Sequence, residues 1–240
     1  MLLQSTTTVN YLLFNTQHIN TFLTVFIGKD MKLQVITSPT YTENQGQTWD
    51  INCDKYNPVV RQYMEALIRI TKEAKQQFKN PMAYHFWIRL NEGRKITEFM
   101  DNLKKRYLRN NGFNIIYLRV KEFDDDHKEH HHIFLYLDQH KTRPNSLSSV
   151  LRDFQGEGKL LFNYELCIWE SEITDEQRWR AEVYGEKLKK IYHLPMRTEQ
   201  DVANIINKGS YLAKTHTKRI GAGQVNMSTS RLKKHVGVLA

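Results

Sequence analysis

A histidine-rich segment in the middle of the chain could hold a metal ion. Residues 122–138 read EFDDDHKEHHHIFLYLD, with three consecutive histidines before an apolar run. On a β-strand, residues i and i+2 project from the same face about 7 Å apart, so His130 and His132 would be neighbours and His131 would point the other way. Two imidazoles on one face can share one divalent ion. The apolar residues 133–137 indicate a buried strand, which is the rigid support that a catalytic metal requires.

A third ligand that offers oxygen would suit this site to Mg or Mn. Both ions prefer oxygen ligands, so two imidazoles alone do not favour them. Glu122, at the end of the preceding strand and across a hairpin, is the best-placed candidate. Strand alternation groups it with Ile116, Leu118 and Val120 but does not determine which face meets the histidines. The aspartates 124–126 are fallback ligands, and the simpler interpretation of the segment is a charged hairpin end with incidental histidines.

A second segment, SYLAKTHTK at residues 210–218, combines a phenol with cations. On a helix, Tyr211, Lys214 and Lys218 fall at i, i+3 and i+7 and so share one face. Ammonium groups there could bind a phosphodiester and stabilise the phenolate that attacks it. The simpler alternative is an amphipathic helix whose tyrosine packs and whose lysines face water.

The end of the chain is basic. The net charge is +9, and no acidic residue follows Asp201. The positive residues beyond it are Lys208, Lys214, Lys218, Arg219, Arg231, Lys233 and Lys234. Clustered cations displace counterions from phosphates, which favours nucleic acid as the partner and anionic lipid second. A solvated basic tail is the alternative.

The elements that must position these residues alternate in type. Helices are expected at 58–78, 96–110 and 145–154, and strands at 83–90, 113–123, 130–137 and 163–172. From residue 83 the order is β-α-β-β-α-β, the split arrangement of ferredoxin-like and RRM-like domains. Such an α+β fold packs two helices on one face of a four-stranded antiparallel sheet and leaves the other face available for function.

The remaining segments flank this unit. Residues 36–57 are polar with little periodicity and are expected to form a loop-like lead-in. Two more helices are expected at about 173–192 and 197–218, the second bearing the tyrosine. The cysteines, Cys53 and Cys167, do not suggest a disulfide framework, which fits a reducing cytoplasm. We expect neither a signal peptide nor a membrane span.

Together these motifs resemble a known family. HHHIFLYL in a strand, a glutamate eight residues upstream and YLAK about eighty residues downstream resemble the HUH endonuclease superfamily. The likeness is to the single-tyrosine rolling-circle replication initiators of inoviruses and their prophage relatives, of the YagK/YfjJ C-terminal domain type. It covers residues 57–219, the expected endonuclease domain, which leaves 1–56 as a partly flexible N-terminal extension and 220–240 as a basic, mobile tail. The pattern departs from the family at His131, where an aliphatic or aromatic residue is usual.

The resemblance implies a mechanism. His130, His132 and Glu122 would hold Mg or Mn, and Tyr211 would attack the scissile phosphate to form a 5′-phosphotyrosine and release a 3′-hydroxyl. Lys214 would orient and neutralise the phosphate. The DNA contacts would come from Lys218, Arg219 and Lys208.

The resemblance also implies partners. The substrate would be single-stranded DNA at a replication origin, in the cytoplasm of a bacterial host, with the host polymerase and helicase and no membrane. The motif has one tyrosine, so the second strand transfer would need a second subunit of a homodimer, a re-engaged Tyr211 or another group.

Two other functions remain open at this point. A nucleic-acid-binding regulator or packaging protein on the same fold could stack bases on Phe134 and Tyr136 without cutting. An unrelated zinc hydrolase could use three histidines as ligands. The second is disfavoured because adjacent residues on a strand cannot all face one ion.

Overall fold

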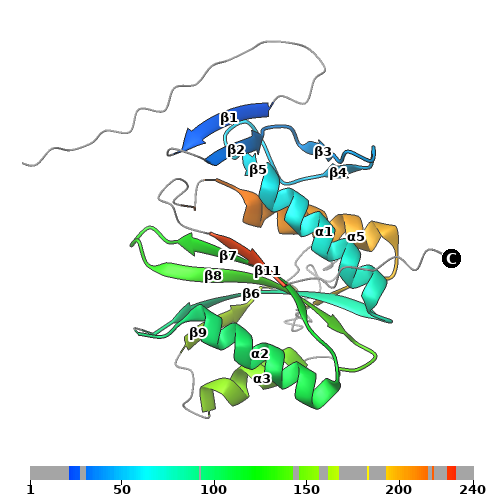
Figure 1. Ribbon diagram of the computed structural model, residues 1–240, viewed down its shortest axis with the longest axis vertical. Coiled ribbons are helices and arrows are strands. Elements are labelled where there is room, and N and C mark those ends of the chain that lie inside the picture. The colour runs from blue at the N-terminus through cyan, green and yellow to red at the C-terminus, as the bar shows by residue number, and fades with distance from the viewer. Residues whose placement is uncertain are drawn as a thin grey trace, which may run out of the picture.

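The chain folds into alternating layers of sheet and helix (Figure 1). The computed structural model describes residues 22–27, 31–91, 93–142, 146–156, 162–167, 183, 193–215, 218 and 226–230. From top to bottom in Figure 1, these form a small N-terminal sheet, a helical layer, the main sheet and a second helical layer. This is an α+β architecture, as expected. None of the helices in the described part of the chain is both long and apolar enough to cross a bilayer.

The main sheet is antiparallel and contains six strands. They are β6 (Pro81–Leu90), β7 (Ile116–Phe123), β8 (Glu129–Asp138), β9 (Phe162–Leu166), β10 (His193–Pro195) and β11 (Met227–Thr229). The order is β10-β6-β8-β7-β11, and β9 pairs with the other half of the β6 edge that β10 occupies. The hairpin of β7 and β8 predicted from the histidine segment is present. This hairpin lies inside the sheet, because β6 pairs with β8 on one side and β11 pairs with β7 on the other.

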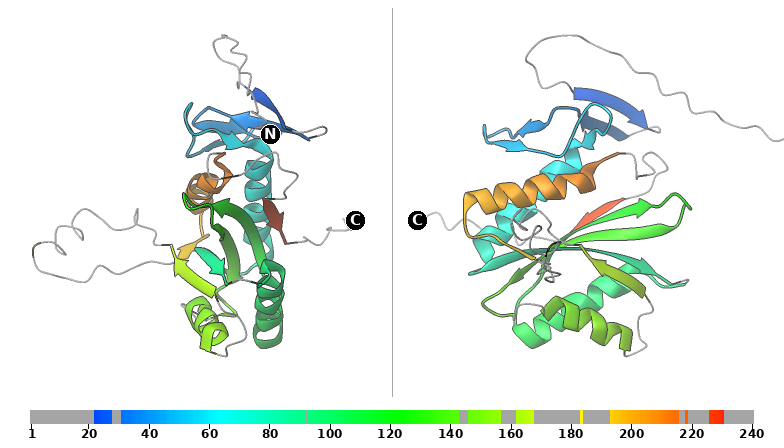
Figure 2. Two further views of the ribbon diagram at one scale, coloured as in Figure 1. Left: turned by 90° about the vertical axis from the view of Figure 1, so that its left-hand side faces the viewer. Right: turned by 180° about the vertical axis from the view of Figure 1, so that it is seen from behind.

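Helices cover both faces of this sheet. On one side lie α2 (Ile96–Asn111) and α3 (Ser146–Gly156), and on the other α1 (Arg61–Gln77) and α5 (Glu199–Gly209) (Figures 1 and 2). The expected pair of helices, α2 and α3, does pack on one face, but the expectation that the other face is left open was wrong. The second face is also apolar: Val120, Phe134 and Tyr136 point to it and are fully buried, so it needs a helical cover.

Described residues between Ile36 and Cys53 belong to the folded body. Two strands, β1 (Phe22–Ile27) and β2 (Met31–Ile36), form a sheet with β5 (Val59–Val60), and β3 (Thr40–Thr42) pairs with β4 (Thr48–Asp50). The expectation of a loop-like lead-in at 36–57 was therefore wrong. Tyr41 and Trp49 are 4 % exposed and belong to the same buried cluster as β6 and β8. Strands of three residues are too short to give a recognisable period.

The tyrosine lies on a 3-10 turn. A capping box of Thr198 with Asp201 starts α5, the helix ends at Gly209, and η2 (Ser210–Ala213) follows. Lys214 is already extended, with ψ 146°, so the expectation of one α-helix with Tyr211, Lys214 and Lys218 on one face was wrong. The reason is local anchoring. The Ser210 hydroxyl accepts a hydrogen bond from Asn52 N at 2.7 Å, and Lys214 forms a β-bridge with Val59.

Two expected segments are only partly visible. Of the helix predicted at 173–192, residue 183 alone is among the described residues, and Arg219 lies outside them. Within the predicted tail 220–240, Met227–Thr229 forms β11 and pairs with β7, so this stretch is part of the sheet.

Candidate metal centre

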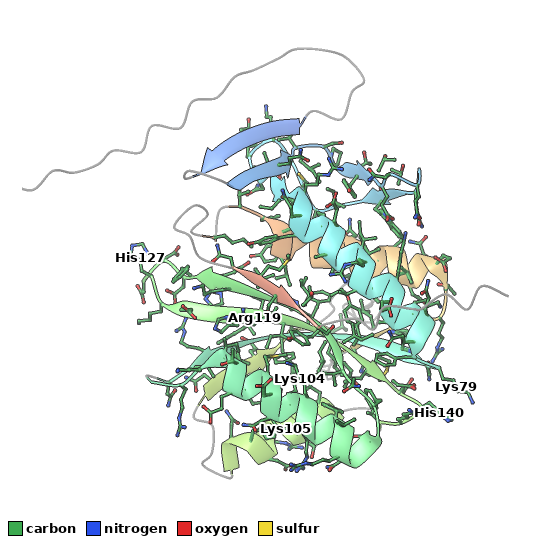
Figure 3. The ribbon with its side chains drawn as sticks, in the orientation of Figure 1. Lys79, Lys104, Lys105, Arg119, His127 and His140 are labelled. Atoms are coloured by element: carbon green, nitrogen blue, oxygen red, sulfur yellow. The ribbon has the colours of Figure 1, made fainter. Side chains whose placement is uncertain are left out.

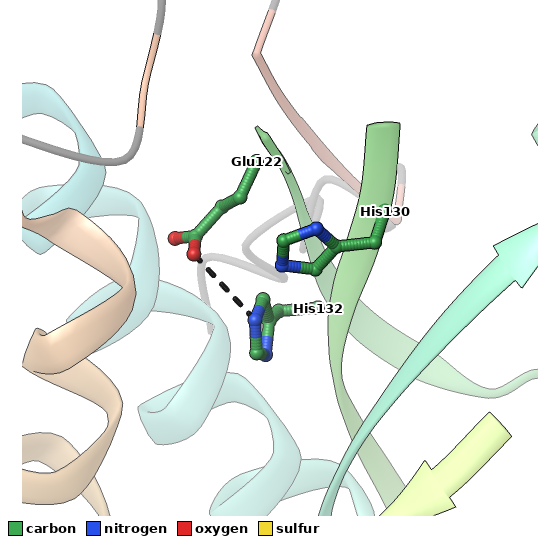
Figure 4. Close-up of side chains that lie close together, drawn as sticks. All are labelled: Glu122, His130 and His132. Atoms are coloured by element: carbon green, nitrogen blue, oxygen red, sulfur yellow. Dashed lines mark ion pairs between the residues drawn. The ribbon is translucent and has the colours of Figure 1, made fainter. Parts of the chain in front are cut away.

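Strand pairing brings Glu122, His130 and His132 together. Glu122 is the direct cross-strand partner of His130, and His132 lies two residues further along β8 on the same face. One ligand atom from each of the three side chains lies within 4.8 Å of the other two (Figure 4). Nε2 of His132 is 3.5 Å from Oε2 of Glu122. Two imidazoles and a carboxylate at this spacing can converge on one divalent cation.

The third histidine points to the opposite face. His131 is 3 % exposed, and its Nε2 lies 3.1 Å from a carboxylate oxygen of Glu129. Burial, with the nearby charges of Arg119 and Lys121, lowers the pKa of His131 to about 3. The register in which His130 and His132 share a face is therefore the one adopted, and His131 is a buried neutral side chain.

Two of the three alternative carboxylate ligands, Asp124 and Asp126, form ion pairs in the hairpin turn. Asp124 forms an ion pair with Arg89 and accepts a hydrogen bond from Lys128 N. Asp126 pairs with Lys128 at 3.2 Å. The one group of potential metal ligands found among the described residues contains neither aspartate.

The protonation state of His132 suits metal binding. Burial lowers the pKa of His132 to about 4, although the charge of Glu122 acts in the opposite direction. The ring is therefore neutral at pH 7 and offers a nitrogen lone pair, as a metal ligand must. Nδ1 of His130 is buried without a hydrogen-bond partner in the described part of the chain. A buried, unsatisfied nitrogen on a candidate ligand is an observation that a bound cation would explain.

A residue that sequence reasoning missed, His85, supports this pair from β6. Its Nε2 lies 3.1 Å from Nδ1 of His132, and its ring stacks on Phe134 with the centroids 4.8 Å apart. Burial and the neighbouring His132 hold the pKa of His85 well below its usual value. The hydrogen bond engages Nδ1 of His132 and so leaves Nε2 toward Glu122. A single histidine in a strand carries no such signal until the β6–β8 register is known.

Lys218 also contacts the candidate metal centre, through Glu122. Its Nζ lies 2.8 Å from Oε1 of Glu122, and the two side chains are 0 % and 2 % exposed. From the sequence, Lys218 was expected to bind DNA. Its ammonium group has no exposed surface, so in this structure it cannot contact a phosphate of bound DNA. Of the other assigned DNA contacts, Lys208 lies in the last turn of α5, and Arg219 lies outside the described residues.

Tyr211, the expected nucleophile, lies on η2. The residue is 39 % exposed, and Nζ of Lys214 lies 5.1 Å from the centroid of its ring. Burial raises the pKa of the Tyr211 phenol, and the charges of Glu122 and Cys167 raise it further. Lys214 therefore lies beside the phenol ring, as expected, and the convergence of the phenol with the three candidate metal ligands stays a prediction.

The aromatic residues proposed to stack bases are buried. Phe134 and Tyr136 are 0 % exposed, and the Tyr136 hydroxyl hydrogen-bonds to Thr71 of α1 at 2.7 Å. Trp87 of β6 is a partly exposed aromatic near the centre, with its ring 6.3 Å from that of His130. Its indole N–H donates to Glu165 of β9. A base could therefore reach Trp87 but not the two expected residues.

Comparisons with known proteins give no match: no family model matches the chain, and neither does any curated protein or solved structure. Function must therefore be inferred from the geometry of the described residues.

Proposed function

We propose that this protein is a metal-dependent nuclease of the HUH type that cuts and rejoins single-stranded DNA through a tyrosine. The observation that carries the proposal is the group formed by Glu122, His130 and His132. Tyr211, on η2, is the nucleophile of this proposal. Phosphoryl transfer to a side chain requires a nucleophile, and a metal ion can assist it as a Lewis acid, so the proposal needs the Tyr211 phenol to act beside this group.

The chain order of the central elements supports the proposal. From β6 to β9 the elements run β6-α2-β7-β8-α3-β9, and the corresponding strands are ordered β9-β6-β8-β7. We interpret this order as that of a split β-α-β, ferredoxin-like unit, which supports the proposal. In this proposal α1, α5 and the N-terminal strands are additions to that unit, and they hold the tyrosine turn over its otherwise open face.

The chemistry assigns a role to each residue. A bound Mg or Mn ion would polarise the scissile phosphate and offset its charge. His130, His132 and Glu122 supply two nitrogens and an oxygen from rigid strands. The Tyr211 oxygen attacks phosphorus, its proton passes to solvent, and a phosphotyrosine ester forms at the 5′ end. The bond to the 3′ oxygen breaks, and that oxygen takes up a proton to become the 3′-hydroxyl. Lys214, beside the Tyr211 ring, would neutralise the phosphate.

The biological setting follows from that product. A free 3′-hydroxyl primes synthesis, so we propose that the protein initiates rolling-circle replication of a phage or prophage element in the bacterial cytoplasm. Its partners would be origin single-stranded DNA and the host polymerase and helicase. A homodimer could provide a second Tyr211 for the closing strand transfer.

The decisive experiment looks for the covalent intermediate. A pool of random-sequence single-stranded DNA, labelled at the 3′ end, is incubated with the protein and Mn²⁺ and run on a denaturing gel. The wild type should give a protein-linked label, and Tyr211→Phe should give none while retaining DNA binding. Tyr56→Phe is the matched control, because Tyr56 is 78 % exposed. An adduct of undiminished yield in Tyr211→Phe would remove the tyrosine from the mechanism. DNA binding by the wild type without any adduct would favour a non-catalytic binding protein.

A further inference from the structure

The candidate carboxylate ligand already has a cation beside it. Glu122 and Lys218 are 96 residues apart in sequence, yet Nζ and Oε1 lie 2.8 Å apart in the interior. The other oxygen of the same carboxylate, Oε2, lies 3.5 Å from Nε2 of His132. The two oxygens are therefore differentiated: one faces the ammonium group, and the other faces the histidine.

The ammonium group is anchored to the segment that follows the tyrosine. Nζ of Lys218 also donates to the carbonyl oxygen of Lys214. The backbone N–H of Lys218 donates to Thr215 O, and Thr215 N donates to Pro58 O. The side chain thus bridges the Tyr211–Lys218 segment and the end of β7, with its charge held at a fixed position beside Glu122.

We propose that Lys218 is a positioning residue: it holds Glu122 with one oxygen toward His132, and its charge weakens the binding of a divalent cation at the centre. This inference rests on the proposed function to the extent that Glu122, His130 and His132 bind a cation. It replaces the DNA-gripping role that the sequence suggested for Lys218.

The positive charge of Lys218 determines the direction of its effect on divalent-cation affinity. A fixed positive charge next to a metal ligand repels an incoming dication, and the repulsion is strong in the interior, where water screens it poorly. Removing that charge should therefore tighten cation binding. A residue that merely supported the fold would have the opposite effect, because its loss would loosen the ligands and weaken binding.

The test measures metal affinity directly. Mn²⁺ is titrated calorimetrically into the full-length protein without DNA, comparing wild type with Lys218→Met and Lys218→Arg. We expect Lys218→Met to bind Mn²⁺ more tightly by on the order of tenfold, and Lys218→Arg, which keeps the charge, to stay near the wild type. Lys105→Met is the control for loss of one charge; Lys105 is exposed on α2, across the sheet from the centre (Figure 3).

Folding and catalysis are followed in parallel. Losing one member of a buried ion pair destabilises a protein, so thermal melting with and without Mn²⁺ accompanies each titration. A larger Mn²⁺-induced stabilisation of Lys218→Met than of the wild type supports the inference even if the variant melts early. The adduct yield of Lys218→Met should fall despite its tighter metal binding, because Glu122 is no longer held.

Other outcomes overturn the inference. Unchanged or weaker Mn²⁺ binding in folded Lys218→Met would do so, as would a loss of DNA affinity with Mn²⁺ binding unaltered. In both cases the wild-type centre still binds metal, so the proposed function stands. A wild type that binds no Mn²⁺ removes the metal centre itself, and the proposed function falls together with this inference.

Discussion

Glu122 on β7 and His130 on β8 are direct partners in the antiparallel ladder, so their side chains leave the sheet on the same side. Strand alternation alone does not show which histidines share a face with Glu122, and this pairing does. It puts the carboxylate beside His130 and His132 and excludes His131. The composition of the candidate centre is therefore a consequence of backbone register, and substitutions within the histidine triplet can test it.

We expect the three histidines to differ sharply in metal binding. His130→Ala and His132→Ala each remove a ligand and should weaken Mn²⁺ binding by more than about tenfold. His131→Leu should bind Mn²⁺ like the wild type, because His131 is buried on the opposite face. Calorimetric titration of the three variants checks this. Loss of binding in His131→Leu with retention in His130→Ala would show that the other register is the working one.

The hydrogen bond between His85 and His132 should also affect metal affinity measurably. Partners of metal-bound histidines typically contribute about 10–100-fold in affinity, so His85→Phe should weaken Mn²⁺ binding within that range. His85→Gln can still hydrogen-bond to Nδ1 of His132 and should recover part of the loss. His140→Phe, at the far end of the sheet (Figure 3), is the control. Equal affinities for His85→Phe and the wild type would remove His85 from the centre.

Much of the sheet was predictable from sequence because its signals are local. The run at 83–90 and the histidine strand are rich in aromatic and β-branched residues, and both are strands within a few residues of the expected bounds. Gly112 ends α2 with φ 68°, a left-handed conformation that glycine adopts without strain. Such signals need no knowledge of distant parts of the chain.

The features that could not be predicted depend on long-range packing. Helical periodicity shows that one side of α1 is buried, but it does not show which face of the sheet α1 covers. The ion pair of Lys218 with Glu122 joins residues 96 positions apart, and the i, i+3, i+7 pattern that grouped Lys218 with Tyr211 assumed an α-helix that ends at Gly209. The grouping of the three candidate ligands was predictable because strand alternation places two of them, His130 and His132, on one face.

The raised pKa of Tyr211 predicts a rising pH–rate profile. Burial and the charge of Glu122 shift the phenol above its usual 10.0, so it is protonated at neutral pH. The phenolate fraction then grows up to about tenfold per pH unit. At saturating Mg²⁺, the single-turnover rate of adduct formation should increase from about pH 7 to about pH 9 without a plateau. A plateau near neutral pH would mean that substrate or metal lowers the pKa of Tyr211 in the working complex.

A buried hydrogen bond between Thr71 of α1 and Tyr136 of β8 should contribute to stability. The two hydroxyl oxygens are 2.7 Å apart, and both residues are fully buried. Thr71→Val leaves the Tyr136 hydroxyl without this partner, at a cost of about 1–3 kcal/mol in the free energy of unfolding. Urea denaturation checks the loss.

The double variant Thr71→Val/Tyr136→Phe provides the internal control for this bond. It removes both hydroxyl groups and leaves no buried group unsatisfied, so it should be more stable than the sum of the two single losses predicts. Strictly additive losses would mean that the hydroxyl pair is not coupled. Helix α1 would then be held on the histidine strand by apolar contact alone, since Thr71 and Tyr136 lie among buried side chains such as Leu67 and Phe134.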